Sequence, residues 1–85
     1  MKPKIDVIGT KFWMLNDKCH REDGPAVEKI DGFKSWWIHG KRHRTDGPAI
    51  VCRDGEKEWW IKGIELTEQE WLSEVLFNEV KISSL

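Results

Sequence analysis

A 23-residue period runs through most of the chain. Trp13, Trp36 and Trp59 lie at that spacing, and each ends a copy of the pattern G-x-K-x-W. Two copies continue into a second block, H-R-x-D-G-P-A, at residues 20–26 and 43–49. At such a period each copy is one supersecondary unit, and neighbouring units bury a shared core by stacking. The chain is therefore predicted to be a repeat protein.

Each unit is predicted to contain a β-hairpin. Residues 34–39 alternate along the chain and are rich in aromatic and β-branched side chains, as strands are. The second strands are expected at residues 26–30 and 49–53, and Asp-Gly pairs at 31–32 and 54–55 favour tight turns between strands. The predicted fold is mainly β, an antiparallel β-meander of about five to six strands.

The repeat ends where a third H-R block would begin. Thr67 and Glu70 have the spacing of a capping box, which starts a helix. The apolar side chains that follow fall on one helical face: Trp71, Leu72, Val75, Leu76 and Val80. We predict a single domain of residues 1–85, with hairpin repeats over about residues 5–66 and one C-terminal α-helix over about residues 67–80 that caps them.

The H-R-x-D-G-P-A blocks contain residue types that enzymes use as a base, an anion clamp and an orienting carboxylate. A catalytic set is assembled once, however, whereas these residues recur with the fold period. Asp before Gly-Pro can bind backbone N–H groups, Arg can pair with a carboxylate, and His can satisfy a buried carbonyl. We therefore expect that the chain is not an enzyme and that the repeated residues have a structural role. These residues are His20, Arg21, Asp23, Gly24, Pro25, His43, Arg44, Asp46, Gly47 and Pro48.

Composition excludes several other classes. Cys19 and Cys52 occupy different positions of the repeat and lack the spacing of zinc ligands, so no metal and no cofactor are expected. The net charge of −1 gives no overall attraction to nucleic acid or to a membrane surface. No apolar run approaches the roughly 18 residues of a membrane span. We expect no membrane association and a cytoplasmic location.

Strand alternation separates the aromatic side chains into two rows. The first row, Trp13, Trp36 and Trp59, is expected on one face of the sheet. The second row, Met14, Trp37 and Trp60, then points to the opposite face. A domain of this size hardly buries both rows. Either the C-terminal helix covers the second row, or Trp37 and Trp60 form an exposed apolar patch of the kind that marks an interface.

The second row lies beside a basic turn at residues 41–44. The predicted contact surface for a protein partner consists of Trp37, Trp60, Met14, Lys41, Arg42 and Arg44. Basic groups among aromatic rings also suit single-stranded nucleic acid. That alternative is less favoured, because phosphate contacts need a sustained basic footprint. Self-association through open sheet edges is a third option.

The motifs resemble a group of repeat proteins from tailed bacteriophages and large DNA viruses. Units of that group read W-x-x-N-G-K-x-H-R-x-D-G-P-A, to which residues 36–49 correspond, and their last unit becomes G-K-x-L-T-E-x-E-[FW], to which residues 63–71 correspond here. The unit length and hairpin character are also similar to MORN repeats. The chain departs from the group at Asp17, where Gly is usual, and at Cys19. The resemblance implies an accessory viral protein rather than an enzyme. Together with the predicted contact surface, it leads us to expect a bacteriophage accessory protein that binds and modulates or inhibits a host protein.

Overall fold

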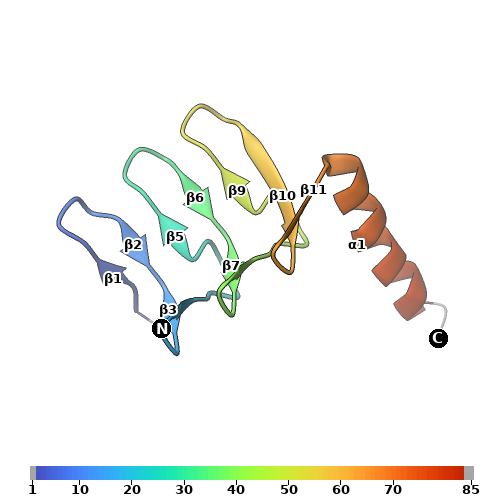
Figure 1. The fold of residues 1–85 in the computed structure, drawn as a ribbon, viewed down its shortest axis with the longest axis horizontal. Helices are drawn as coiled ribbons and strands as arrows, with labels where there is room; N and C mark the ends of the chain where they lie inside the picture. The colour runs from blue at the N-terminus through green and yellow to red at the C-terminus, as the bar shows by residue number, and fades with distance from the viewer. Residues whose placement is uncertain (1, 84–85) are drawn as a thin grey trace.

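The computed structural model describes the backbone of residues 2–83 and the side chains of residues 2–77. Short strands and one helix follow the chain as a ladder (Figure 1). These elements are β1 Lys4–Ile5, β2 Lys11–Phe12, β3 Met14–Leu15, β4 Lys18–Cys19, β5 Val27–Glu28, β6 Lys34–Ser35, β7 Trp37–Ile38, β8 Lys41–Arg42, β9 Ile50–Val51, β10 Lys57–Ile61, β11 Ile64–Leu66 and α1 Glu68–Ser83.

The ladder is built from two kinds of antiparallel hairpin. A seven-stranded sheet has the order β1-β2-β5-β6-β9-β10-β11, and two further pairs, β3-β4 and β7-β8, lie outside it. In each of the first two units, therefore, one hairpin belongs to the main sheet and a second hairpin, β3-β4 or β7-β8, projects from it (Figure 1). In the third unit the corresponding hairpin, β10-β11, is continuous with the main sheet. The prediction of a mainly β, antiparallel meander with one C-terminal helix is confirmed.

The described residues form eleven short strands, rather than the five or six that were predicted. The predicted strand at residues 34–39 is divided because the backbone changes partner at Trp36. Its N–H donates to the Ala49 carbonyl at 2.7 Å, whereas its carbonyl accepts from His43 N–H at 3.1 Å. Part of the basic turn that was predicted at residues 41–44 forms strand β8 instead.

The hairpins of the main sheet turn at glycine. Gly32 has a φ of 100°, in the left-handed region that glycine adopts without strain. The carboxylate of Asp31 accepts the Phe33 N–H at 3.0 Å and so closes the turn. The next unit repeats this bond between Asp54 and Glu56 at 3.1 Å. Both Asp-Gly turns were predicted and are confirmed.

The second kind of hairpin uses a two-residue turn. In all three turns both residues have positive φ: 51° and 63° at Asn16-Asp17, 49° and 79° at His39-Gly40, and 49° and 82° at Lys62-Gly63. Two consecutive positive φ angles define the type I′ turn, whose twist matches that of the flanking strands. Asp17 is one of the few non-glycine residues that tolerate this conformation, and the turn forms despite the departure at this position.

The core is thin and follows the ladder. The buried apolar side chains are Trp13, Ala26, Val27, Ala49, Ile50 and Trp71. Val27 pairs with Ser35, and Ser35 pairs with Ile50, so these three share the buried face of the sheet. Lys11 and Lys34 lie on the opposite, exposed face. Over the described residues, no helix is long and apolar enough to cross a membrane.

Helix α1 begins with the predicted capping box. The Thr67 N–H donates to the Glu70 carboxylate at 2.8 Å, and the Glu70 N–H donates to the Thr67 hydroxyl at 3.1 Å. Trp71 is buried, whereas Leu72 is 43% exposed and Leu76 is 48% exposed. The helix therefore caps the ladder through Trp71, Val75 is half-buried, and Leu72 and Leu76 of the predicted apolar face are uncovered. The side chain of Val80, also placed on that face, lies outside the described residues.

Candidate functional site

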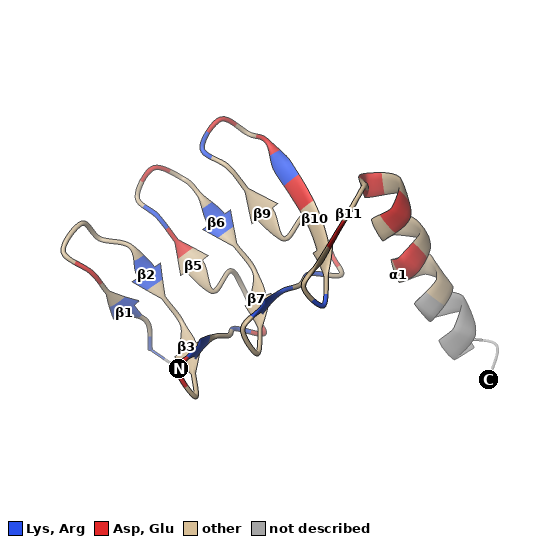
Figure 2. Cartoon of the chain, viewed as in Figure 1, with Lys and Arg blue, Asp and Glu red and all other residues tan. Residues whose placement is uncertain are grey.

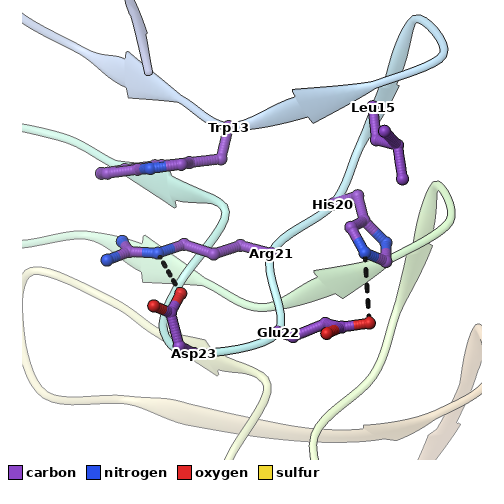
Figure 3. A pocket seen from close by; sticks show the side chains of 6 residues that line it. All are labelled: Trp13, Leu15, His20, Arg21, Glu22 and Asp23. Atoms are coloured by element: carbon purple, nitrogen blue, oxygen red, sulfur yellow. Dashed lines mark hydrogen bonds and ion pairs between the residues drawn. The ribbon is translucent and has the colours of Figure 1, made fainter. Parts of the chain in front are cut away.

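The arginine of each H-R-x-D-G-P-A block stacks on the tryptophan of its own unit. The Arg21 guanidinium carbon lies 3.9 Å from the Trp13 ring centre, and its Nε donates to Asp23 at 3.0 Å (Figure 3). Its Nη1 donates to the Pro25 carbonyl at 3.1 Å. This arginine clamp ties the aromatic row to the Gly-Pro turn through a cation–π contact and two hydrogen bonds.

The second unit repeats the clamp with nearly the same dimensions. Arg44 lies 3.8 Å from the Trp36 ring centre. It donates to Asp46 at 2.8 Å and to the Pro48 carbonyl at 3.0 Å. A Cβ on Gly47 would lie only 2.8 Å from the Arg44 guanidinium carbon, so glycine is needed for this close approach. Gly24 has the same relation to Arg21 in the first unit, at 2.9 Å.

The aspartate pairs with the arginine of its own block. The expectation that the arginine pairs with a carboxylate is confirmed, because Asp23 and Asp46 each accept from the Nε of that arginine. The hydrogen bond and charge of Arg21 lower the pKa of Asp23. The stacking of each arginine on its tryptophan ring holds the side chain over the turn, and this position brings the guanidinium within reach of the carboxylate.

The histidines join each unit to the next. His39 N–H donates to His20 Nδ1 at 2.9 Å, and Lys62 N–H donates to His43 Nδ1 at 3.0 Å. Both donors lie in the type I′ turn of the following unit. We expected the imidazole to bind a carbonyl, and this was wrong, because the turn of the next unit presents an N–H instead. An imidazole accepts at Nδ1 only when it is neutral.

The surroundings of His43 favour that neutral form. Desolvation lowers its pKa, and the nearby Lys62 ammonium lowers it further. His20 is buried, its ring lies 4.4 Å from the ring of His39, and its Nε2 lies 3.7 Å from a Glu22 carboxylate oxygen (Figure 3). Further bonds lock the units together, such as Gly40 N–H to the Cys19 carbonyl at 2.8 Å.

These side chains do not converge on one chemical centre. In the first unit Arg21 points to Asp23 and His20 points to Glu22, on separate sides of an open recess (Figure 3). His43 lines the recess of the next unit. Among the residues whose side chains are described, no group of three or more His, Cys, Asp or Glu could hold a metal ion. The arrangement is suited to joining units rather than to transferring a proton.

The second row encloses an arginine. The Arg42 guanidinium carbon lies 4.9 Å from the Trp37 ring centre and 4.8 Å from the Trp60 ring centre. The indole N–H of Trp37 donates to Ser35 at 2.7 Å, and that of Trp60 donates to Glu58 at 3.0 Å. Arg42 Nε is buried and has no hydrogen-bond partner in the described part of the chain. Two rings on either side of one cation thus occupy this face.

The structure shows neither of the two arrangements that were expected for the second row, namely burial by the helix or exposure to solvent. Trp71 of the helix packs on Trp59 of the first row, with ring centres 4.7 Å apart, and donates to the Arg44 carbonyl at 2.7 Å. Through Trp71 the helix therefore covers the first row. Both rings are half-buried rather than exposed, because the Arg42 guanidinium covers part of them.

The other residues of the predicted contact surface are divided between two faces. Met14 is half-buried and pairs with Cys19, in register with the second row. Lys41 is exposed and available for contact. Arg44 does not belong to this surface, because its guanidinium is held over Trp36 in the first row. The predicted contact surface is therefore reduced to the half-buried second row and one exposed cation, Lys41.

An apolar groove at the C-terminal end was not predicted. It has a volume of about 510 Å³ and lies between the last hairpin and the helix. This β11–α1 groove is lined by Ile61, Ile64 and Leu66 from the sheet and by Glu70, Ser73 and Glu74 from the helix, with Lys62 beside the turn. The repeat alignment contains a signal for it, since Ile64 stands at the position of Lys41 and Leu66 at that of His43.

The fold and these contacts define a class, a β-hairpin repeat ladder that one helix closes. No family model, curated protein or solved structure matches the chain. The resemblance to phage and viral repeat proteins therefore depends on the sequence motifs alone.

Proposed function

We propose that the chain is a non-catalytic module that binds another protein. The proposal is supported mainly by uncovered apolar side chains at the C-terminal end, where Ile64 and Phe77 are each 64% exposed. Large apolar groups that cluster at the surface favour an interface. The histidines and arginines of both H-R blocks are already engaged within and between units, which supports a structural role for them rather than a catalytic one.

The nature of the partner follows from the motif resemblance. We propose that the chain is a bacteriophage accessory protein, that it acts in the host cytoplasm, and that its partner is a host protein. A rigid ladder would modulate or inhibit that partner by covering part of its surface. The nucleic-acid alternative has less support, because bases stack on free ring faces and Arg42 lies against both Trp37 and Trp60.

The test is capture of a bacterial protein on the immobilised chain, followed by titration calorimetry with the purified pair. We expect a saturable complex of fixed stoichiometry. The variant Ile64→Ser should weaken it, whereas Ile30→Ser should not, because Ile30 is more exposed (79%) but lies at the tip of the β5–β6 hairpin. If no captured protein binds again after purification, the chain is not a protein-binding module.

A further inference from the structure

The β11–α1 groove differs in chemistry from the equivalent recesses of the other units. In the second unit the equivalent recess is lined by Ile38, His39, Lys41 and His43, with Lys62 of the next turn beside it, and His43 is bonded within the ladder. In the third unit Leu66 and Thr67 stand at the positions of the histidine and the arginine, and Trp71 packs on Trp59. The groove floor is consequently apolar and takes no part in joining units.

The helix forms the second wall of this groove. Glu70, Ser73 and Glu74 line it, and Phe77 follows at the i, i+3, i+4, i+7 spacing that places side chains on one helical face. Phe77 is as exposed as Ile64, at 64% each. Ile64 therefore lines the groove from β11, and Phe77 continues the helical face of the α1 wall beyond the lining residues.

The groove also carries negative charge. Two carboxylates, Glu70 and Glu74, and one ammonium group, Lys62, line it, and Glu65 and Glu68 lie in the same stretch of chain outside the lining. Figure 2 shows the acidic residues in red on β11 and along the first turns of α1. The chain as a whole has a net charge of only −1, so this negative charge is a local feature of the C-terminal end.

We propose that the β11–α1 groove binds a basic amphipathic segment of a partner protein. This assignment rests on the proposed protein-binding function and names the chemistry of the partner. Apolar side chains of the segment would cover Ile64 and Phe77, and its lysines or arginines would face Glu70 and Glu74. An amphipathic segment that lies in an apolar groove, with charges at the rim, is a common mode of peptide recognition.

A second copy of the chain is a less suitable occupant. Symmetric pairing through the groove would bring the acidic wall of one helix against that of the other, and like charges oppose such contact. Growth of the particle mass with concentration in light scattering, lost in Phe77→Ser, would instead assign the groove to a second copy and would overturn the proposal.

The test uses a fluorescein-labelled amphipathic peptide of leucine and lysine and a matched peptide in which glutamate replaces every lysine. Fluorescence anisotropy should show that the intact chain binds the lysine peptide, with an affinity that falls as salt is raised from about 50 to about 300 mM. The glutamate peptide should not bind. Equal affinity for both peptides, or no binding of either, would refute the assignment.

Two pairs of variants locate the binding. Phe77→Ser and Glu74→Lys should each weaken binding of the lysine peptide by roughly fivefold to tenfold. Leu72→Ser is the control for the apolar change, because Leu72 is 43% exposed and lies about 140° around the helix from Phe77. Glu56→Lys, in the β9–β10 hairpin, is the control for charge. A control that is as damaging as its partner variant would show that the peptide binds elsewhere.

These outcomes are distinguishable from failure of the proposed function. A chain that captures a host protein but binds both peptides equally would retain its protein-binding function and lose only the assignment of the groove. A chain that captures no protein loses the function itself, whatever the peptides do.

Discussion

The bond between His43 and the next unit should make stability depend on pH. Desolvation and the Lys62 charge lower the pKa of His43 in the folded chain, while in the unfolded chain the imidazole titrates near its usual pKa of about 6.5. The unfolded state therefore binds a proton more readily as the pH falls. The contribution of His43 is complete above about pH 6.5 and is lost as the pH falls through the lowered folded pKa.

The magnitude follows from one hydrogen bond. Protonation converts Nδ1 from an acceptor into a donor, so the 3.0 Å bond from Lys62 N–H is lost. A hydrogen bond of this kind contributes about 1 kcal/mol, and for a domain of this size that corresponds to a shift in Tm of about 4–8 °C. Because His43 is only half-buried, we expect the fall in Tm to be near the lower end of this range when the pH is lowered from about 7.5 to about 5.

The variant His43→Asn isolates this effect. An asparagine carbonyl oxygen can accept the same N–H but has no proton to gain in this pH range. We expect His43→Asn to unfold near the wild-type Tm at about pH 7.5, and to lose about 4 °C less than wild type when the pH is lowered to about 5. Differential scanning calorimetry measures both, and the other histidines contribute equally to each chain. An identical pH slope in the two chains would refute the reasoning.

Three further substitutions test the remaining contacts by thermal unfolding. Arg44→Lys should lower the free energy of unfolding by about 1–3 kcal/mol. A lysine ammonium cannot bind the Asp46 carboxylate and the Pro48 carbonyl together while it stacks on the Trp36 ring, as the arginine guanidinium does. The control Arg53→Lys, in an exposed turn, should change the stability little. Thr67→Ala should cost about 1 kcal/mol through loss of the helix cap. Trp71→Ala should cost about 3–5 kcal/mol, and circular dichroism should show a simultaneous loss of helix, whereas Leu72→Ala should leave the helix in place. Equal effects of Trp71→Ala and Leu72→Ala would contradict the role of Trp71 as the cap.

The periodic part of the fold was predictable because it is local. Asp31 and Gly32 determine their turn through contacts within three residues, and the capping box of Thr67 and Glu70 is equally short-range. Alternation also separated Trp36 from Trp37 correctly, since the first stacks on Arg44 and the second on Arg42. Contacts of this kind follow from residue type and spacing alone.

The contacts between units were not predictable in this way. The partner of His20 is an N–H 19 residues further along the chain, and its identity depends on how one hairpin docks on the next. The cover of Trp60 by Arg42 likewise comes from the neighbouring unit. We expected the second row to be either buried by the helix or exposed to solvent. Cover by Arg42 was not predicted, because this side chain reaches both rings only when neighbouring units are stacked.

The replacement of the usual turn glycine by Asp17 is explained by the place of that turn in the ladder. Gly40 and Gly63 lie against lysine side chains of the preceding unit. A Cβ atom added to Gly40 would lie 3.2 Å from Lys18, and one added to Gly63 would lie 3.5 Å from Lys41. Within the described residues no backbone hydrogen bond joins the Asn16-Asp17 turn to a preceding unit, so the usual glycine can be replaced by Asp17 there.

The same reasoning applies at the other end of the ladder. Leu66 stands where a histidine would accept an N–H from a following unit, and the Thr67 N–H is already taken by Glu70. Residues that keep the 23-residue period thus serve the stacking of units. Residues that break it, such as Ile64, Leu66 and Phe77, are free of that role, and these are the residues on which selection for a partner can act.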